Sequence, residues 1–235
     1  MLDRSSRNRS TTPWPRDVQN RRDNLQCEAP SRYAGHMKLV GRYDSPYVRR
    51  VGVTLHVLHL PFEHLSLSPF SQASEFRRHA AIGRMPVLVL ENGEALIESA
   101  AILDYLDEVA GPTRALLPAA GRERRKCLQI LARATAACDK AIAINYERRR
   151  PAERVFDEWI ERCRSQLSAA LTELESFRLE LTNFREPQQI EITSACTYAY
   201  VSRVAPDVLS AGRYPWLERL SSVCEARHQF LACPQ

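Results

Sequence analysis

The sequence predicts an α/β domain with the element order βαβαββα, followed by an all-α domain. Short apolar runs of strand length alternate with segments of helical period between residues 37 and 111. Beyond a linker at 112–121, which contains Pro112 and Pro118, only helical periods remain. The chain has 235 residues, 44% of them hydrophobic and 26% charged, which suffices for two packed units.

The first half of the α/β domain has a clear periodicity. A strand is expected over 38–43 and a helix over 47–59. One face of this helix is apolar, formed by Val48, Val51, Leu55 and Leu58. A second strand over 62–67 and a weakly patterned helix over 72–79 follow. This order of elements is the βαβα half of the predicted unit.

The second half of this domain is a predicted hairpin and a closing helix. The apolar run Pro86-Val87-Leu88-Val89-Leu90 indicates a strand covered on both faces. Asn92-Gly93 predicts a type I′ turn, so Glu94 to Ile97 should return antiparallel. The helix that ends near Gly111 has apolar residues at i, i+3, i+4 and i+7, namely Ile102, Tyr105, Leu106 and Val109.

The all-α domain is expected to span residues 122–235. Two long amphipathic helices are predicted over 122–149 and 153–180, and shorter ones over 194–204 and 216–226. The second long helix carries a stripe formed by Val155, Trp159, Cys163, Leu167, Leu171 and Leu174.

Residues 1–36 differ from the rest of the chain. They hold seven Arg against four acidic residues and show no apolar period, so we expect a disordered N-terminal extension. A transit peptide is the alternative, but four acidic residues argue against it. Subtracting the +3 of this segment from the +5 of the chain leaves +2, too little for a nucleic-acid surface. We therefore expect no nucleic-acid partner.

The seven cysteines include no C-x-x-C pair, and the histidines have no zinc-ligand spacing. We therefore expect no metal and a cytoplasmic protein with reduced thiols. No apolar run of about 18 residues exists, so no membrane span is expected.

Three sequence motifs contain the candidate catalytic and ligand-binding residues. The segment Tyr43-Asp44-Ser45-Pro46-Tyr47-Val48-Arg49 places a hydroxyl at a helix N-terminus, where unpaired N–H groups favour negative charge. By itself, Ser45-Pro46 is better explained as a simple N-cap with no chemical role. Gly83-Arg84-Met85-Pro86-Val87-Leu88 enters the third strand, and Glu98-Ser99 opens the helix after the hairpin.

Together these motifs identify a family resemblance. The first is similar to the Cys-Pro-Tyr-Cys site of glutaredoxins, with Ser45 and Val48 at the thiol positions, and the second matches the cis-proline loop of thioredoxin-like folds. Residues 225–230 are typical of the last helices of one such family. Over residues 37–235 the chain resembles the glutathione S-transferase superfamily, of a bacterial type with serine in the active site.

The resemblance implies a glutathione site in a thioredoxin-like domain. It implies that Met85 offers its backbone to the cysteinyl part of glutathione, next to a cis bond at Pro86. Glu98 and Ser99 would hold the γ-glutamyl end. Arg84 is either a solvated loop charge or a contact of the glycyl carboxylate. Without the other motifs, Glu98-Ser99 would be only a helix start with a favourable acidic residue.

The resemblance also assigns the thiol and the second substrate. Ser45 would donate a hydrogen bond to the glutathione thiolate, with Tyr43 and Tyr47 as rival donors. Tyr47, Ile142 and Tyr146 are expected in the second-substrate pocket. The run Arg148-Arg149-Arg150 either favours an acidic electrophile or is a solvated helix end. In the helix expected from 194, Thr193-Ser194-Ala195-Cys196 occupies the capping box, which Cys196 would weaken.

The expected function is that of a glutathione transferase of the detoxification type. It would use glutathione as co-substrate to conjugate or reduce a small electrophile, as a homodimer. A non-catalytic binding or interaction module is the alternative. The absence of Cys at positions 45 and 48 argues against a thiol-disulfide reductase, and the absence of a Ser-Ser-Cys run argues against isomerisation of maleylacetoacetate.

Overall fold

The structure is a computed structural model that describes residues 36–179 and 185–235. The expected disordered extension, residues 1–36, lies outside the described residues except for His36. The predicted order βαβαββα and the following helical part are both confirmed.

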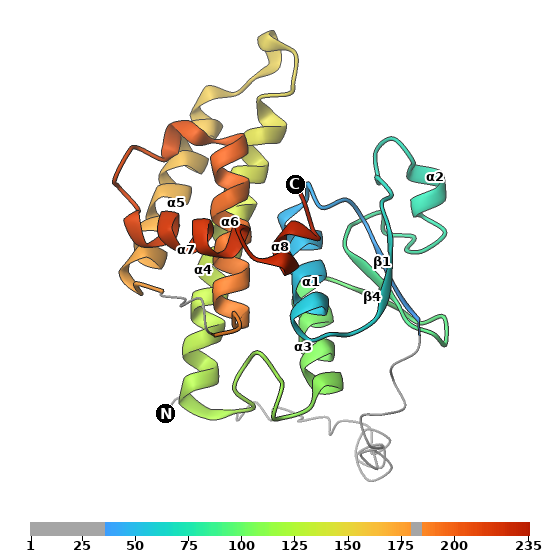
Figure 1. Cartoon of the computed structure of the whole chain (residues 1–235). Coiled ribbons are helices and arrows are strands. Elements are labelled where there is room, and N and C mark those ends of the chain that lie inside the picture. Colours follow the sequence, from blue (N-terminus) through green and yellow to red (C-terminus); the bar gives the residue numbers. More distant parts are fainter. Residues whose placement is uncertain (1–35, 180–184) are drawn as a thin grey trace, which may run out of the picture. The chain divides into compact units, whose positions relative to one another are not determined.

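Four short strands form one mixed sheet with the order β2-β1-β3-β4 (Figure 1). They are β1 (Met37–Val40), β2 (Phe62–Leu65), β3 (Val87–Val89) and β4 (Ala95–Ile97). β1 pairs in parallel with β2 and antiparallel with β3, and β3 pairs antiparallel with β4. β3 therefore lies inside the sheet, and Val87 and Leu88 are buried, as predicted for a strand covered on both faces.

Helices cover both faces of this sheet. α1 (Pro46–Val57) and α3 (Ser99–Ala110) lie on one face, and the short α2 (Ala73–Phe76) lies on the other (Figure 1). Because successive strand residues point to opposite faces, Leu39 and Leu88 pack with α1 and α3, whereas their neighbours Val40 and Val87 pack with Phe76 of α2.

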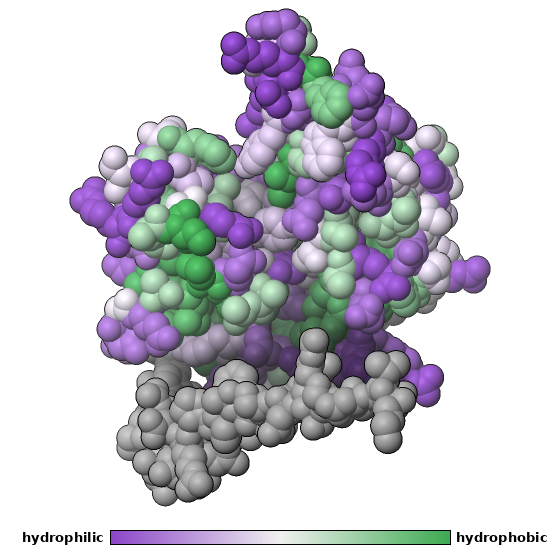
Figure 2. Space-filling model, turned by 180° about the vertical axis from the view of Figure 1, so that it is seen from behind, coloured by the Kyte–Doolittle hydropathy of each residue, from purple (hydrophilic) through white to green (hydrophobic). Residues whose placement is uncertain are grey.

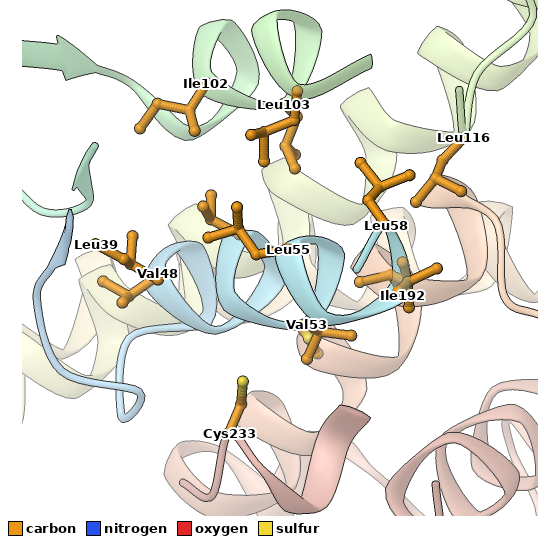
Figure 3. Packing of buried hydrophobic residues seen from close by; sticks show 14 of the residues in the cluster. Leu39, Val48, Val53, Leu55, Leu58, Ile102, Leu103, Leu116, Ile192 and Cys233 are labelled. Atoms are coloured by element: carbon orange, nitrogen blue, oxygen red, sulfur yellow. The ribbon is translucent and has the colours of Figure 1, made fainter. Parts of the chain in front are cut away.

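Helix α1 is buried on several sides, and this positions its N-terminus. Leu55 lies towards α3, while Val53 faces Cys233 near the end of the chain (Figure 3). Leu58 packs near Leu116 and Ile192 (Figure 3). The helix that follows the Ser45 motif is therefore fixed by both the sheet and the helical part of the chain.

The helical part contains five α-helices and two 3₁₀ turns within the described residues. These are α4 (Gly121–Glu147), η3 (Ala152–Arg154), α5 (Asp157–Ser176), α6 (Gln189–Val204), η4 (Pro206–Val208), α7 (Pro215–Glu225) and α8 (His228–Leu231). α4, α5 and α6 enclose a second core that includes Ile144, Leu167 and Val201. No described helix is long and apolar enough to cross a bilayer.

On the face seen in Figure 2, hydrophobic and hydrophilic residues are interspersed.

The predicted stripe of the second long helix needs one correction. Its members Cys163, Leu167, Leu171 and Leu174 are buried as expected. Trp159, however, is 37% exposed and stacks beneath Lys140, and Ile160 takes the core position instead. The helix begins at Asp157 rather than 153, because the preceding residues form the separate turn η3.

Two local predictions were wrong. The hairpin turn is not type I′, because Gly93 has a positive φ of 86° but Asn92 does not. Gly93 donates its N–H to Leu90, and Asn92 accepts from the Glu94 N–H, which makes a three-residue connection. The type I′ prediction required positive φ at both central residues, which only the glycine adopts.

The capping box is also elsewhere. α6 begins at Gln189, five residues before the expected start, and a reciprocal capping box joins Gln188 to Glu191. Thr193 and Cys196 therefore lie inside the helix, and the expected weakening at Cys196 does not arise. Gln is not among the preferred N-cap residues, so the sequence contained no N-cap signal for this helix start.

Candidate functional site

Ser45 caps the N-terminus of α1, in the loop that follows β1. Its backbone has φ −83° and ψ 124°, and its Oγ accepts a hydrogen bond from the Val48 N–H at 3.5 Å. Pro46 occupies the first helical position, where a missing N–H costs no helical bond and the fixed φ suits the helix. The local sequence thus forms a helix start that favours a negative charge beside it.

Capping does not exhaust the hydrogen-bonding capacity of Ser45. A hydroxyl accepts through two lone pairs and donates one hydrogen, and capping uses only one lone pair. The capping bond is also long at 3.5 Å. Ser45 can therefore cap α1 and donate its hydrogen to an anion at the same time.

The loop before β3 brings Met85 next to this helix start. The Met85-Pro86 bond is cis, as the family resemblance implied. Gly41 makes the close approach possible, since a Cβ there would lie 2.7 Å from Val48 Cγ2 and 3.0 Å from Met85 Cβ. Within the described residues, the backbone N–H and C=O of Met85 have no hydrogen-bond partner, so both are available to a ligand.

Glu98 and Ser99 form the start of α3. Glu98 has φ 65° and ψ 113°, a region that residues with a Cβ rarely occupy, and such strain often marks a functional position. Its carboxylate pairs with Arg84 at 3.0 Å, and both side chains are more than half exposed. Ser99 is buried, and its Oγ accepts a hydrogen bond from Arg50 at 2.7 Å.

Two cavities meet at Met85. The first has a volume of about 340 Å³ and is lined by Arg42, Asp44, Ser45, Pro46, Ser68, Phe70, Met85, Ile142, Asn145, Tyr146, Arg149, Tyr200, Arg203 and Val204. The second has a volume of about 220 Å³ and is lined by Tyr47, Arg50, Arg84, Met85, Pro86, Glu98, Ser99, Ala100, Thr135 and Asp139. Residues of three sequence motifs that lie far apart in the chain thus line two cavities that share Met85.

The structure divides the three residues expected around the second substrate. Ile142 and Tyr146 line the cavity that holds Ser45, and the Tyr146 ring packs edge-on against Phe70 at 6.0 Å. Tyr47 instead lines the cavity that holds Glu98, because its side chain extends to α4, where the hydroxyl bonds to Asp139. The placement of Tyr47 with Ile142 is therefore corrected.

The rival tyrosines have other partners. Tyr43 is buried, stacks on His64 with ring centroids 3.9 Å apart, and hydrogen-bonds to Cys233. Burial raises the pKa of Tyr43, and burial is also the main cause of the raised pKa of Tyr47. Both are thus neutral phenols engaged elsewhere, and Tyr43 lines neither of the two cavities.

The arginine run at the end of α4 serves two purposes. Arg148 bonds to Val204 and Asp207, and Arg150 pairs with Glu147 at 3.2 Å, so these two stabilise the helix end. Arg149 lines the cavity that holds Ser45. The solvated helix end therefore describes Arg148 and Arg150, and a preference for an acidic electrophile stays a prediction for Arg149 alone.

None of the described cysteines lines the cavity that holds Ser45. Six are free thiols, and all but Cys127 are buried. Burial raises the pKa of Cys233 to about 11, so that thiol is unreactive near neutral pH. Among the described residues, no group of three His, Cys, Asp or Glu side chains could hold a metal ion.

Two residues of this region were not foreseen. Arg50 lies beneath Ser99, and Asp139 on α4 accepts from Tyr47. A signal for Arg50 did exist, because Arg49-Arg50 places two cations near a helix N-terminus, which the macrodipole disfavours. Asp139 gave no such signal, since it is one of several polar residues on a long amphipathic helix.

The chain resembles known proteins over most of its length. Residues 39–114 match the model of the glutathione S-transferase N-terminal domain. The uncharacterized GST-like protein YibF of Escherichia coli is 30% identical over 173 residues, which cover 72% of this chain and 85% of that protein.

Solved structures agree with this. A glutathione S-transferase from Methylobacterium radiotolerans, in complex with glutathione sulfonate, has 27% identity and a TM-score of 0.76, covering 84% of this chain and 94% of that one. A glutathione transferase family member from Pseudomonas fluorescens with bound glutathione has 27% identity and a TM-score of 0.72, covering 84% and 98%. The chain therefore belongs to the glutathione S-transferase superfamily.

Proposed function

We propose that this protein is a glutathione transferase that activates the glutathione thiol at Ser45 for attack on a small electrophile. One observation carries the proposal: Met85 lines two cavities, one holding Ser45 and the other holding Glu98 and Ser99. Glutathione has three linked parts, and this arrangement offers a group for the thiol, a group for the peptide and a group for the γ-glutamyl end. The glutathione bound to similar proteins supports the same choice of ligand.

In the proposed complex, polar groups hold glutathione along its length. The backbone of Met85 bonds to the cysteinyl amide, which leaves the thiol near Ser45. The γ-glutamyl ammonium meets Glu98, and its carboxylate meets Ser99 at the start of α3. Arg84 pairs with Glu98 at 3.0 Å, so we place Arg84 at this end of the ligand rather than at the glycyl carboxylate.

The proposed chemistry needs a thiolate near neutral pH. A hydrogen bond to a charged acceptor contributes about 1.5 to 3 kcal/mol, which lowers a thiol pKa by roughly one to two units. From about 8.5, this makes the thiolate the main form near pH 7.5. The sulfur then attacks the electrophile, a C–S bond forms, and the leaving group departs with the electron pair of its bond. Ile142 and Tyr146 would contact the electrophile.

Affinity for glutathione and turnover test this function together. We expect retention on immobilised glutathione, elution by free glutathione, and conjugation of a chlorodinitrobenzene above the uncatalysed rate. Retention without conjugation or glutathione-dependent reduction, over a panel of electrophiles, would favour the non-catalytic binding module. Failure to bind glutathione at all would refute both.

We also propose a homodimer, in which the thioredoxin-like part of one subunit faces the helical part of the other. Family membership supports this arrangement. Light scattering at micromolar concentration should give twice the mass of 26.8 kDa. A monomer would overturn the dimer while leaving the proposal for Ser45 intact.

A further inference from the structure

Arg50 is a buried cation beside the proposed γ-glutamyl site. It lies on α1, is 4% exposed, and lines the 220 Å³ cavity with Glu98 and Ser99. Its guanidinium donates a hydrogen bond to Ser99 Oγ at 2.7 Å and lies 5.6 Å from the centre of the Tyr47 ring. Arg50 therefore extends from α1 to the first residue of α3.

Within the part of the chain that the structure describes, no carboxylate forms an ion pair with this guanidinium, although the nearby Glu98 charge stabilises it in part. The two acidic side chains of the cavity are engaged elsewhere: Glu98 pairs with Arg84, and Asp139 bonds to Tyr47. Arg50 Nε is fully buried and has no hydrogen-bond partner among the described residues. A buried, unpaired charge is costly, and its cost is removed when an anion enters beside it.

The bond between Arg50 and Ser99 has only one possible direction. A guanidinium has five N–H donors and no acceptor, so Ser99 Oγ must accept. The hydroxyl hydrogen of Ser99 therefore remains available to an acceptor in the cavity. Ser99 can thus donate its hydrogen to a carboxylate, and the adjacent guanidinium charge disfavours an ammonium group at the same place.

We propose that Arg50 is a positioning residue that makes this end of the site select a ligand with a carboxylate. It leaves the Ser99 hydrogen available to the carboxylate and supplies the positive charge beneath it, while Glu98 meets the neighbouring ammonium. The inference rests on the proposed function, because it takes the γ-glutamyl end of glutathione as the occupant. Burial lowers the pKa of Arg50, and a bound carboxylate would oppose that effect.

Three ligands separate the two charges of the γ-glutamyl group. Glutathione carries both, glutaryl-Cys-Gly lacks the ammonium, and 4-aminobutyryl-Cys-Gly lacks the carboxylate. Calorimetric titration of the full chain with each ligand measures the contribution of each charge. A general disturbance of the fold would lower the affinity for all three ligands alike. Differences between the ligands therefore report on the role of Arg50.

In Arg50→Gln the dissociation constants for glutathione and glutaryl-Cys-Gly should rise by about 10- to 100-fold. The dissociation constant for 4-aminobutyryl-Cys-Gly should rise by less than about threefold. Glu98→Gln is the reciprocal variant, and it should lower the affinity only for the two ligands that carry the ammonium group. Equal losses for all three ligands in Arg50→Gln, or no loss, would overturn the proposal. Wild-type protein that binds no glutathione would instead overturn the proposed function.

Arg50→Gln replaces a buried residue, so its fold is checked by circular dichroism and thermal unfolding. If it does not fold, wild type and Ser99→Ala provide the test. Wild type should prefer glutathione over 4-aminobutyryl-Cys-Gly by at least about tenfold, and Ser99→Ala should keep part of that preference because the cation remains. A wild type without this preference, or a Ser99→Ala variant that loses all of it, contradicts the role of Arg50.

Discussion

Arg49 on α1 and Glu225 on α7 form a bidentate ion pair, with two N–H···O distances of 2.6 Å. The partners differ in burial, since the Arg49 side chain is 2% exposed and that of Glu225 is 38% exposed. Arg49 Nε also donates to the Cys233 carbonyl at 2.8 Å. The helix that begins at Ser45 is thus tied to the last helices of the chain.

This pair predicts a loss of stability in both single variants. Glu225→Ala leaves a cation buried without its carboxylate, and the free energy of unfolding should fall by about 2 kcal/mol, less than for a fully buried pair. Arg49→Met leaves a carboxylate that water can reach but removes the donor of the buried Cys233 carbonyl, so it should cost about 1 to 3 kcal/mol. Urea unfolding measures both. Glu218→Ala, an exposed position on the same helix, is the control, and a loss in Glu225→Ala no larger than in Glu218→Ala would contradict the prediction.

Removing the Ser45 hydroxyl should slow the chemical step more than it weakens glutathione binding. Ser45→Ala should raise the pKa of the bound thiol by roughly one to two units and slow conjugation near neutral pH about 10- to 100-fold. The rate should recover at higher pH, because solvent base can still ionise the thiol. Stopped-flow absorbance of the thiolate and the pH–rate profile test this.

Two further variants separate donation from capping. Ser45→Thr keeps both the hydroxyl and the cap, so it should retain most of the rate. Ser45→Cys should place a low-pKa thiol at the helix start and introduce disulfide exchange with glutathione. If Ser45→Ala keeps the wild-type rate and thiolate absorbance at pH 7, Ser45 is only a cap.

Arg149 should favour an electrophile with an acidic group. Two other cations of its cavity have partners, since Arg42 pairs with Asp44 at 3.5 Å and Arg203 bonds to the Asp44 carbonyl at 2.6 Å. Arg149→Gln should lower kcat/KM for a carboxylated chlorodinitrobenzene about two- to fivefold and leave the neutral compound unchanged. Arg150→Gln, next to it but paired with Glu147, is the control. Equal effects on both substrates, or on both variants, would argue against this preference.

Buried thiols predict a loss of stability in alkali. Burial raises the pKa of Cys138 to about 12, of Cys224 to about 12 and of Cys233 to about 11, from an ordinary value of 9.0. Each folded pKa exceeds the unfolded one, so stability is complete below pH 9 and declines as the pH rises towards 11.

Between pH 8 and pH 10, the ionisation of each of these thiols in the unfolded chain should lower the free energy of unfolding by about 1 kcal/mol. Urea unfolding at a series of pH values measures the loss. Cys224→Ala removes one titrating group, so its loss between pH 8 and pH 10 should be smaller by that amount. A flat profile in wild type, or an identical slope in the variant, would exclude these thiols as the cause.

The sequence predicted the elements whose signal is local. The apolar run of β3 and the alternating order of strands and helices determined the first part of the fold, because period and length distinguish strands from helices there. The start of α6 was missed, since Gln188 is an unusual cap, and Trp159 was placed inside although a cation–π contact with Lys140 holds it at the surface.

The site was harder to predict, because its groups meet only in three dimensions. Glu98 and Ser99 belong to a recognisable helix start, but their neighbour Arg50 comes from α1. The family resemblance placed Tyr47 with Ile142, yet the direction of its side chain takes it to Asp139. Such directions depend on how α1 packs against α4, which no local pattern specifies.

Met85 contributes to the wall of both cavities. A methionine side chain adapts its shape readily, so a change in its rotamer that enlarges one cavity alters the other. Occupation of one cavity should then change affinity at the other, and thermodynamic linkage requires the same factor in both directions. The dissociation constant for glutathione should therefore vary with the electrophile analogue present, and shortening Met85 to Ala should reduce that dependence.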